Sequence, residues 1–159
     1  MILRAAGQLE EALAKLEEKS AVTVDKVTYM ERKGAVLMEL NRMEAAEKVF
    51  RQLDDRNPEN TAYYDNLELC LGLGKGAPVA DRTATYDSIA ERHKRAAAPR
   101  RRFLYVLEGA ELSCRMDDWI IKGLRKGVPS FFKSLDPSHS DPAKVATVEK
   151  LLLNYVGKG

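Results

Sequence analysis

The chain has 159 residues, and 45% of them are hydrophobic, which is enough apolar material for the core of one domain or of a few stacked repeats. Lys and Arg number 26 against 24 for Asp and Glu, so the overall charge gives no indication of a nucleic-acid-binding protein. No apolar run approaches the roughly 18 residues of a membrane span, and no signal peptide is recognisable. The two cysteines form neither a disulfide framework nor a CxxC pair, so we expect a cytoplasmic protein.

Apolar and polar residues nowhere alternate cleanly between turn dipeptides, so the sequence predicts an all-α protein. The first helix is predicted from Gln8 to about Lys19, because apolar residues recur along it at helical spacing. It has the position of the second helix in a hairpin whose first helix is missing. We therefore interpret the chain as a segment of a longer solenoid, in which repeats stack side by side.

Two further helices are predicted to form an antiparallel hairpin. One spans about Asp25 to Leu40, with the Asp25 carboxylate as its N-cap, and the other spans Met43 to Asp54. Asn41 and Arg42 make the turn between them.

Small and apolar residues recur along this part of the chain at an interval of 34 residues, the length of a tetratricopeptide (TPR) repeat. The first set is Gly7, Leu9, Ala12 and Leu16, which recurs as Asn41, Met43, Ala46 and Phe50. Small side chains at Gly34 and Ala46 are expected to let two helices approach closely. The residues predicted to pack the repeats are Gly34, Leu37, Met43, Ala46, Phe50, Pro58, Tyr64 and Leu71.

The repeat pattern has one exception and one closing signal. Lys33 stands where the TPR pattern has Leu. Asn57 is predicted to cap the next helix, with Pro58 at the first helical position. The sequence therefore predicts regular TPR-like hairpins over about residues 7–71.

Beyond Leu71 the pattern becomes irregular, and we predict degenerate helical repeats over about residues 79–157. The stretch from Gly72 to Pro78 ends the regular part. Asp141 and Pro142 form an N-cap and first-position pair for a last helix, which Gly157 ends. No linker is longer than an ordinary loop, so residues 1–159 are expected to form a single TPR-like α-solenoid segment. The predicted elements after the break are helices at about 81–93, 112–124, 131–135 and 142–156, and a short apolar segment at 103–107.

One stretch carries a more specific resemblance: Arg56-Asn57-Pro58-Glu59-Asn60-Thr61-Ala62-Tyr63-Tyr64, followed by Leu67-Glu68. With Met43-Glu44-Ala45-Ala46 before it, and Tyr86 and Pro99-Arg100-Arg101 after it, the chain resembles an inner segment of the auxiliary subunit of the N-terminal acetyltransferase A complex. The chain departs from the family at Arg102-Phe103 and over residues 72–79. The resemblance implies a non-catalytic scaffold that holds the catalytic acetyltransferase and places it at the ribosome for co-translational N-terminal acetylation.

The sequence predicts no catalytic, cofactor or metal site. Gly72-Leu73-Gly74 lacks the Gln or Arg that precedes an acetyl-CoA loop, and it also lacks the features of a Walker-type phosphate loop. His93 and His139 have no Cys, Asp or Glu at the spacing of a helical zinc site, so we expect both to be solvated. Cys70 and Cys114 form no disulfide framework, and we expect both to be buried as small hydrophobic residues.

A basic run gives a candidate surface for a polyanion such as ribosomal RNA, because each Lys or Arg that neutralises a phosphate releases counterions. The alternative is structural: the first group complements the end of a helix, and the second opens the next helix from a solvated turn. The residues of this candidate surface are Arg92, Lys94, Arg95, Arg100, Arg101 and Arg102.

Two other functions remain open from the residues alone. An RNA-binding protein could act through the basic run, and a generic TPR module could bind a peptide, as co-chaperones bind acidic C-terminal tails. Such clamps need Lys or Arg and Asn on the first helix of each repeat, but this chain has Glu31 and Ala35 there, and then Asp65 and Leu69. An acidic peptide would therefore be repelled.

Overall fold

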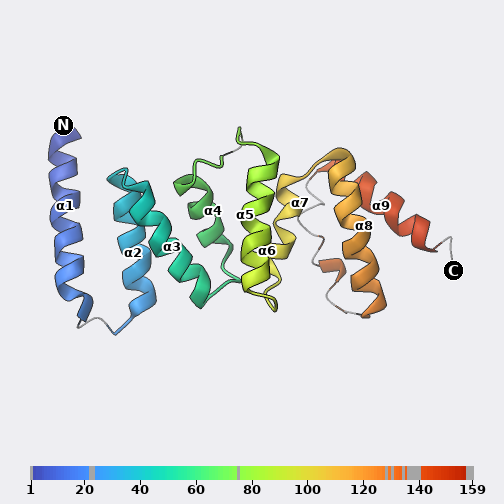
Figure 1. Cartoon of the computed structure of the whole chain (residues 1–159), viewed down its shortest axis with the longest axis horizontal. Helices are drawn as coiled ribbons and strands as arrows, with labels where there is room; N and C mark the ends of the chain where they lie inside the picture. The colour runs from blue at the N-terminus through green and yellow to red at the C-terminus, as the bar shows by residue number, and fades with distance from the viewer. Residues whose placement is uncertain are drawn as a thin grey trace.

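The computed structural model describes residues 2–21, 24–74, 76–127, 129, 131–133, 135 and 141–156. Regular structure in these ranges is entirely helical, which confirms the predicted all-α class. The helices are α1 (Ile2–Glu18), a 3-10 turn (Lys19–Ala21), α2 (Lys26–Glu39), α3 (Met43–Arg56), α4 (Thr61–Cys70), α5 (Val79–Arg92), α6 (Ala98–Arg101), α7 (Phe103–Val106), α8 (Gly109–Arg125) and α9 (Pro142–Val156). They follow one another along the long axis, with α1 and α9 at opposite ends of the array (Figure 1).

The hairpin of α2 and α3 forms as the sequence predicts. The Asp25 side chain caps α2 and accepts hydrogen bonds from the Thr28 amide at 3.0 Å and from the Thr28 hydroxyl at 2.6 Å. Asn41 has a φ of 59°, a left-handed conformation that Asn tolerates better than most residues and that ends a helix. The turn at this position reverses the chain into α3.

Close approach of α2 and α3 depends on the missing side chain of Gly34. A Cβ atom at Gly34 would lie only 2.8 Å from Cζ of Phe50, so the Phe50 ring occupies that space. Ala46 is fully buried in the same seam, and Leu37 and Phe50 are almost fully buried. Met43 is half-buried at the start of α3.

The start of α4 differs from the prediction. Asn57 does not cap α4 but ends α3, where its amide donates to the Leu53 carbonyl at 2.9 Å. Asn60 is the cap of α4, because its side chain accepts from the Ala62 amide at 3.1 Å. The prediction of Pro58 at the first helical position is therefore wrong: Pro58 lies in the turn between α3 and α4, where its carbonyl accepts a hydrogen bond from the Tyr64 hydroxyl.

Two groups of buried apolar residues form the interior. The first joins α1 to α5 and receives Ala98 and Val106 from α6 and α7. The second lies around α8 and α9 and receives Phe103 and Leu104 from α7. Because α7 contributes to both, it links the regular hairpins to the later helices. The second group consists of Phe103, Leu104, Leu107, Leu112, Met116, Ile120, Phe131, Leu135, Val148 and Leu151.

A buried Lys also ties α9 to this second group. Lys144 is 8% exposed, and its Nζ donates to the Leu104 carbonyl at 2.6 Å. The predicted cap of α9 forms, since the Asp141 side chain accepts from the Ala143 amide at 2.9 Å. The predicted end of this helix at Gly157 lies outside the described residues.

The cysteines are less buried than we expected. Cys70 is half-buried and Cys114 is exposed, so the prediction that both are core residues is wrong. Cys114 lies on the outer face of α8, two residues after the buried Leu112. Among the described helices, none is both long and apolar enough to cross a membrane.

Candidate interaction surfaces

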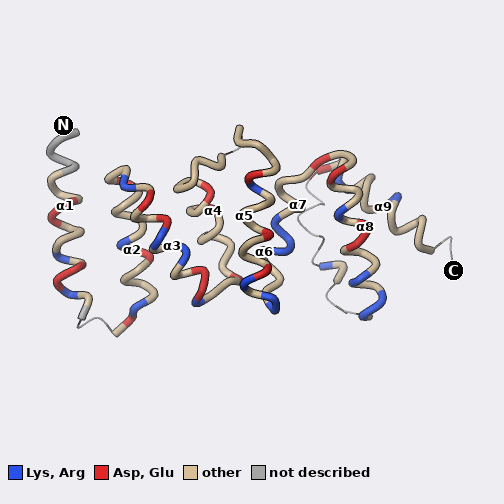
Figure 2. The backbone as a smooth tube through the Cα atoms, in the orientation of Figure 1, with Lys and Arg blue, Asp and Glu red and all other residues tan. Residues whose placement is uncertain are grey.

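The basic run begins at the end of α5 and continues through α6, where Lys and Arg are concentrated in Figure 2. Part of its charge is already neutralised by acidic residues of the preceding repeat. Arg92 pairs with Asp55 at 3.2 Å, and Arg101 approaches Glu59 at 3.8 Å. These two cations therefore contribute less to an anion-binding surface than their sequence position indicates.

Arg102 lies in the interior rather than on the surface. It is 8% exposed, forms an ion pair with Asp65, and its guanidinium carbon lies 5.5 Å from the ring centre of Tyr86 and 5.2 Å from that of Tyr105. Placing Arg102 in the candidate polyanion surface was wrong. Its long side chain fits between aromatic rings, and no sequence spacing reveals that arrangement.

Three exposed cations of the run are not paired with an acidic residue of the described part of the chain: Lys94, Arg95 and Arg100. None of them forms an ion pair with another described residue, although an Arg100 amino group donates to the Lys94 carbonyl. The loop that carries the first two is held by Glu59, whose carboxylate accepts from the Ala97 amide at 2.6 Å and from the Ala98 amide at 3.1 Å. We call these three residues the basic edge.

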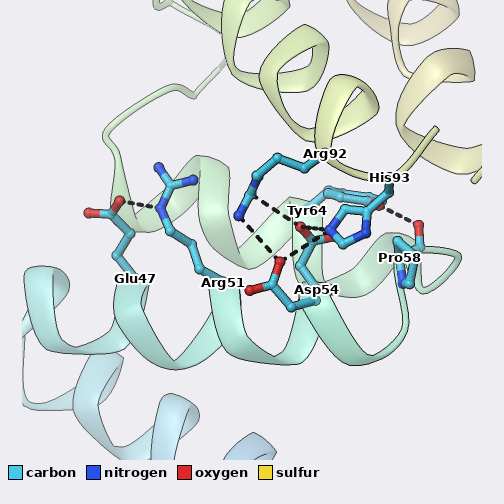
Figure 3. A network of polar contacts seen from close by, with 8 residues as sticks. Glu47, Arg51, Asp54, Pro58, Tyr64, Arg92 and His93 are labelled. Atoms are coloured by element: carbon cyan, nitrogen blue, oxygen red, sulfur yellow. Dashed lines mark hydrogen bonds and ion pairs between the residues drawn. The ribbon is translucent and has the colours of Figure 1, made fainter.

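A polar network connects α3 to the end of α5 (Figure 3). The His93 Nε2 atom lies 3.1 Å from Asp55 Oδ1 and 3.8 Å from Asp54 Oδ2, and Arg92 reaches Asp54 at 3.6 Å. Asp54 is fully buried, and its burial raises the pKa of its carboxyl group above the ordinary value. His93 is therefore not the solvated side chain that we expected.

The same network contains the donor set of a metal site, since the ligand atoms of Asp54, Asp55 and His93 lie within 4.8 Å of one another. Arg92 already brings a positive charge to this cluster, because its guanidinium nitrogens lie 3.2 Å from Asp55 and 3.6 Å from Asp54. We interpret the cluster as an ion-pair network that fastens one repeat to the next. His139, the other histidine, lies outside the described residues.

A groove of about 1130 Å³ lies between α4, α5, α7 and the start of α8, and we call it the acidic groove. Asp65 and Leu69 line it, and they are the positions at which peptide-binding TPR clamps carry Lys or Arg and Asn. Glu31 and Ala35, the equivalent positions one repeat earlier, line a smaller groove of about 410 Å³. The remaining residues of the acidic groove are Glu68, Gly74, Ala77, Val79, Arg82, Arg102, Tyr105, Val106, Glu108 and Glu111.

The family model of the N-terminal acetyltransferase A auxiliary subunit matches residues 1–159, the whole of this sequence. The chain belongs to this family. The resemblance that the sequence shows to this family is thereby confirmed.

Curated relatives in this family agree over nearly the full chain. N-alpha-acetyltransferase 16, NatA auxiliary subunit, is 33% identical in Mus musculus and 32% identical in Homo sapiens, in each case over 97% of this chain. The N-terminal acetyltransferase A complex auxiliary subunit NAA15 of Arabidopsis thaliana is 32% identical over 96%. The chain spans only 18% of the length of each of these relatives.

A solved structure of Naa15/Naa10 bound to HypK-THB contains a chain with the same arrangement of helices. The match has a TM-score of 0.87 at 30% identity, and it covers 99% of this auxiliary-subunit chain and 24% of the solved one. The predicted TPR-like α-solenoid is thus also the fold of a known complex component.

Several features of this auxiliary-subunit chain were not found by sequence reasoning. The His93 contacts escaped it because we compared only residues within one helix, whereas Asp55 lies 38 positions away. The repeat register places Asp65 and Leu69 at clamp-type positions of a first helix, but it does not show which residues lie opposite them across the acidic groove. Nothing in the sequence marks the contribution of Glu108 and Glu111, which enter from an irregular part of the chain.

Proposed function

We propose that this chain is a non-catalytic scaffold segment that helps to hold the catalytic acetyltransferase of an N-terminal acetyltransferase A complex. The observation that carries the proposal is the match over 99% of the chain to a component of the Naa15/Naa10 structure. An α-solenoid exposes long grooved surfaces and is suited to hold a partner by many contacts. Residues 1–159 act as a single solenoid segment in this proposal.

The test is co-purification of the protein that contains this chain with the catalytic acetyltransferase of the same organism. The two proteins are co-expressed, the auxiliary subunit is captured, and the captured material is assayed for N-terminal acetylation of a peptide. The scaffold role predicts a stoichiometric complex, and acetylation that depends on the co-expressed enzyme. Activity of the auxiliary subunit alone, or failure of the two proteins to associate, would contradict it.

We further propose that the complex works in the cytoplasm at the ribosome, and that the basic edge contributes to ribosome association. The supporting observation is that Lys94, Arg95 and Arg100 are exposed without an ion-pair partner among the described residues. Ribosome co-sedimentation over a salt series provides the test. Replacing all three residues by Ala should make the slope of log affinity against log salt shallower by about 2 to 3, since each phosphate contact releases roughly one counterion.

A matched control for this experiment is a triple Ala variant of Arg32, Lys48 and Lys150. These three cations are also exposed and likewise unpaired within the described part of the chain. If both triple variants change the slope equally, net charge rather than the basic edge controls the association. An unchanged slope in both variants would contradict the proposal that this segment contacts ribosomal RNA.

A further inference from the structure

The acidic groove exposes apolar side chains from three different helices. Leu69 of α4 is 58% exposed, Val79 at the start of α5 is 39% exposed, and Tyr105 of α7 is 54% exposed. A single exposed apolar residue is ordinary on a protein surface, whereas here three of them share one hollow, where one occupant can cover them together. The groove therefore offers an apolar floor to an occupant.

The two Arg residues that line the groove are already paired with acidic neighbours. Arg82 pairs with Glu68 at 3.0 Å, and Arg102 pairs with Asp65. The Nε atoms of both Arg side chains are buried, so these side chains are held within the protein surface. The two ion pairs add no net charge to the groove.

Two carboxylates at the start of α8 remain without an ion pair among the described residues. Glu108 and Glu111 are both exposed, and both line the groove. The N-terminus of α8 contributes a partial positive charge of about half a unit, which is less than the two full negative charges. The described lining of the groove is therefore negative as well as apolar.

We propose that the acidic groove binds a basic amphipathic helix of a partner protein, with large apolar residues on one face and Lys or Arg residues beside them. The apolar face would cover Leu69, Val79 and Tyr105, and the cations would meet Glu108 and Glu111. A groove of about 1130 Å³ is larger than most small-molecule pockets, and helices commonly bind in apolar grooves through residues spaced by three and four. The charge is the inverse of that in TPR clamps that bind acidic tails.

This inference goes beyond the proposed scaffold role, because it states the chemistry of an occupant without requiring that the acetyltransferase supplies it. A chain that binds the basic helix but does not co-purify with the acetyltransferase would separate the two proposals.

The test uses a fluorescein-labelled synthetic peptide of 15 residues, with Leu along one helical face and Lys on both sides of that face. Fluorescence anisotropy gives its affinity for the protein that contains this chain. Two matched peptides complete the set: one replaces every Lys by Glu, and the other replaces every Leu by Ser. We expect the original peptide to bind about tenfold more tightly than either matched peptide, since the groove requires both charge and apolar contact.

Two pairs of protein variants locate the site. Replacing both Glu108 and Glu111 by Lys should weaken binding of the original peptide about tenfold, whereas the same change at the exposed Glu91 and Glu149, which lie outside this groove, should have little effect. Leu69→Ser should weaken binding, and Leu153→Ser, on the 71% exposed Leu of α9, should not.

Circular dichroism verifies that each variant remains helical, and all four sets of positions are exposed, so folding should be retained. An equal loss in the two charge-reversal variants would show non-specific attraction and would overturn the proposal. Equal affinity for the Glu peptide or for the Ser peptide would overturn it as well.

Discussion

The helices α2 to α4 and the helices from α5 onward are held together in different ways. In the first region, a small residue meets a large ring in the helix seam, as Gly34 does with Phe50. In the second region, two cations are buried: Arg102 pairs with Asp65, and Lys144 donates to the Leu104 carbonyl. Both regions pack a glycine against a ring, since Gly123 lies against Phe131 in the second, and the first region buries Asp54. The difference is that the second region buries cations, whose partners lie 37 and 40 positions away along the chain, so the 34-residue spacing does not reveal them.

The largest expected effects come from removing one buried ring in each region. Phe50→Ala and Phe103→Ala each delete a side chain that is 2% or 3% exposed, and each should lower the free energy of unfolding by about 3 to 5 kcal/mol. Urea unfolding is followed by circular dichroism for all helices, and by the fluorescence of Trp119, the single tryptophan, which packs only with the second group. Because α7 belongs to both groups, we expect the two signals to change together in both variants.

The comparison would fail in one clear way. If Phe103→Ala shifts the Trp119 transition and leaves a separate helical transition unchanged, the two groups unfold independently. The chain would then consist of two units rather than of one continuous stack.

Overpacking the first region should have a smaller effect. Gly34→Leu places a side chain where even a Cβ atom meets the Phe50 ring, and it should cost about 1 to 3 kcal/mol of unfolding free energy. Gly7→Leu is the matched control, because no atom lies within 4 Å of a Cβ at that position and Leu favours the helix. Equal melting temperatures for the two variants would show that the α2 and α3 seam is looser than described.

Removing the buried Arg102 of the second region should lower the free energy of unfolding by less than Gly34→Leu does. Arg102→Met keeps most of the apolar stem between Tyr86 and Tyr105 but loses the ion pair with Asp65, whose side chain is 60% exposed. We expect a loss of about 1 kcal/mol in urea unfolding, since a half-exposed pair and a cation–π contact contribute modestly. A loss as large as that of Phe103→Ala would show that the charge, rather than the aromatic packing, holds α7 in place.

The smallest effect concerns pH. Burial raises the pKa of Asp54, so the folded protein holds this proton more tightly than the unfolded chain. The contribution of Asp54 to stability is therefore fully present below the unfolded value of 3.8 and is lost as pH rises through the folded pKa. Asp54→Asn has no carboxyl group to ionise, so it avoids this loss. The free energy of unfolding of the variant minus that of the wild type, from urea unfolding, should therefore be larger near neutral pH than below pH 3.8.

Asp55→Asn serves as the control, because Asp55 is exposed in the same network. A pH dependence of unfolding that is identical in the wild type and in Asp54→Asn would exclude the buried carboxyl group as its source.

The sequence predicts features that depend on neighbours along the chain. The Asp25 cap, the turn at Asn41 and the packing of Gly34 against α3 all follow from helix signals and from the 34-residue spacing. The choice of Asn60 over Asn57 as the cap of α4 does not follow from the sequence, because Asn is a good cap at either position. The hydrogen bond from the Tyr64 hydroxyl to the Pro58 carbonyl in the turn before α4 is not apparent from the sequence either.

Contacts between residues far apart in sequence could not be predicted in this way. Arg102 reaches Asp65 across 37 positions, and His93 reaches Asp55 across 38. A basic run can be solvated, paired or buried, and the sequence alone does not distinguish these outcomes. For the same reason, the apolar and acidic sides of the acidic groove become visible as one site only when α4, α5, α7 and α8 are assembled.

The most direct test of the scaffold role is hydrogen–deuterium exchange of the protein that contains this chain, alone and in complex with the catalytic acetyltransferase. If this segment helps to hold the enzyme, backbone amides within residues 1–159 should exchange more slowly in the complex, in peptides that carry the groove-lining helices. Exchange that is identical across all of these peptides in the two states would contradict the account.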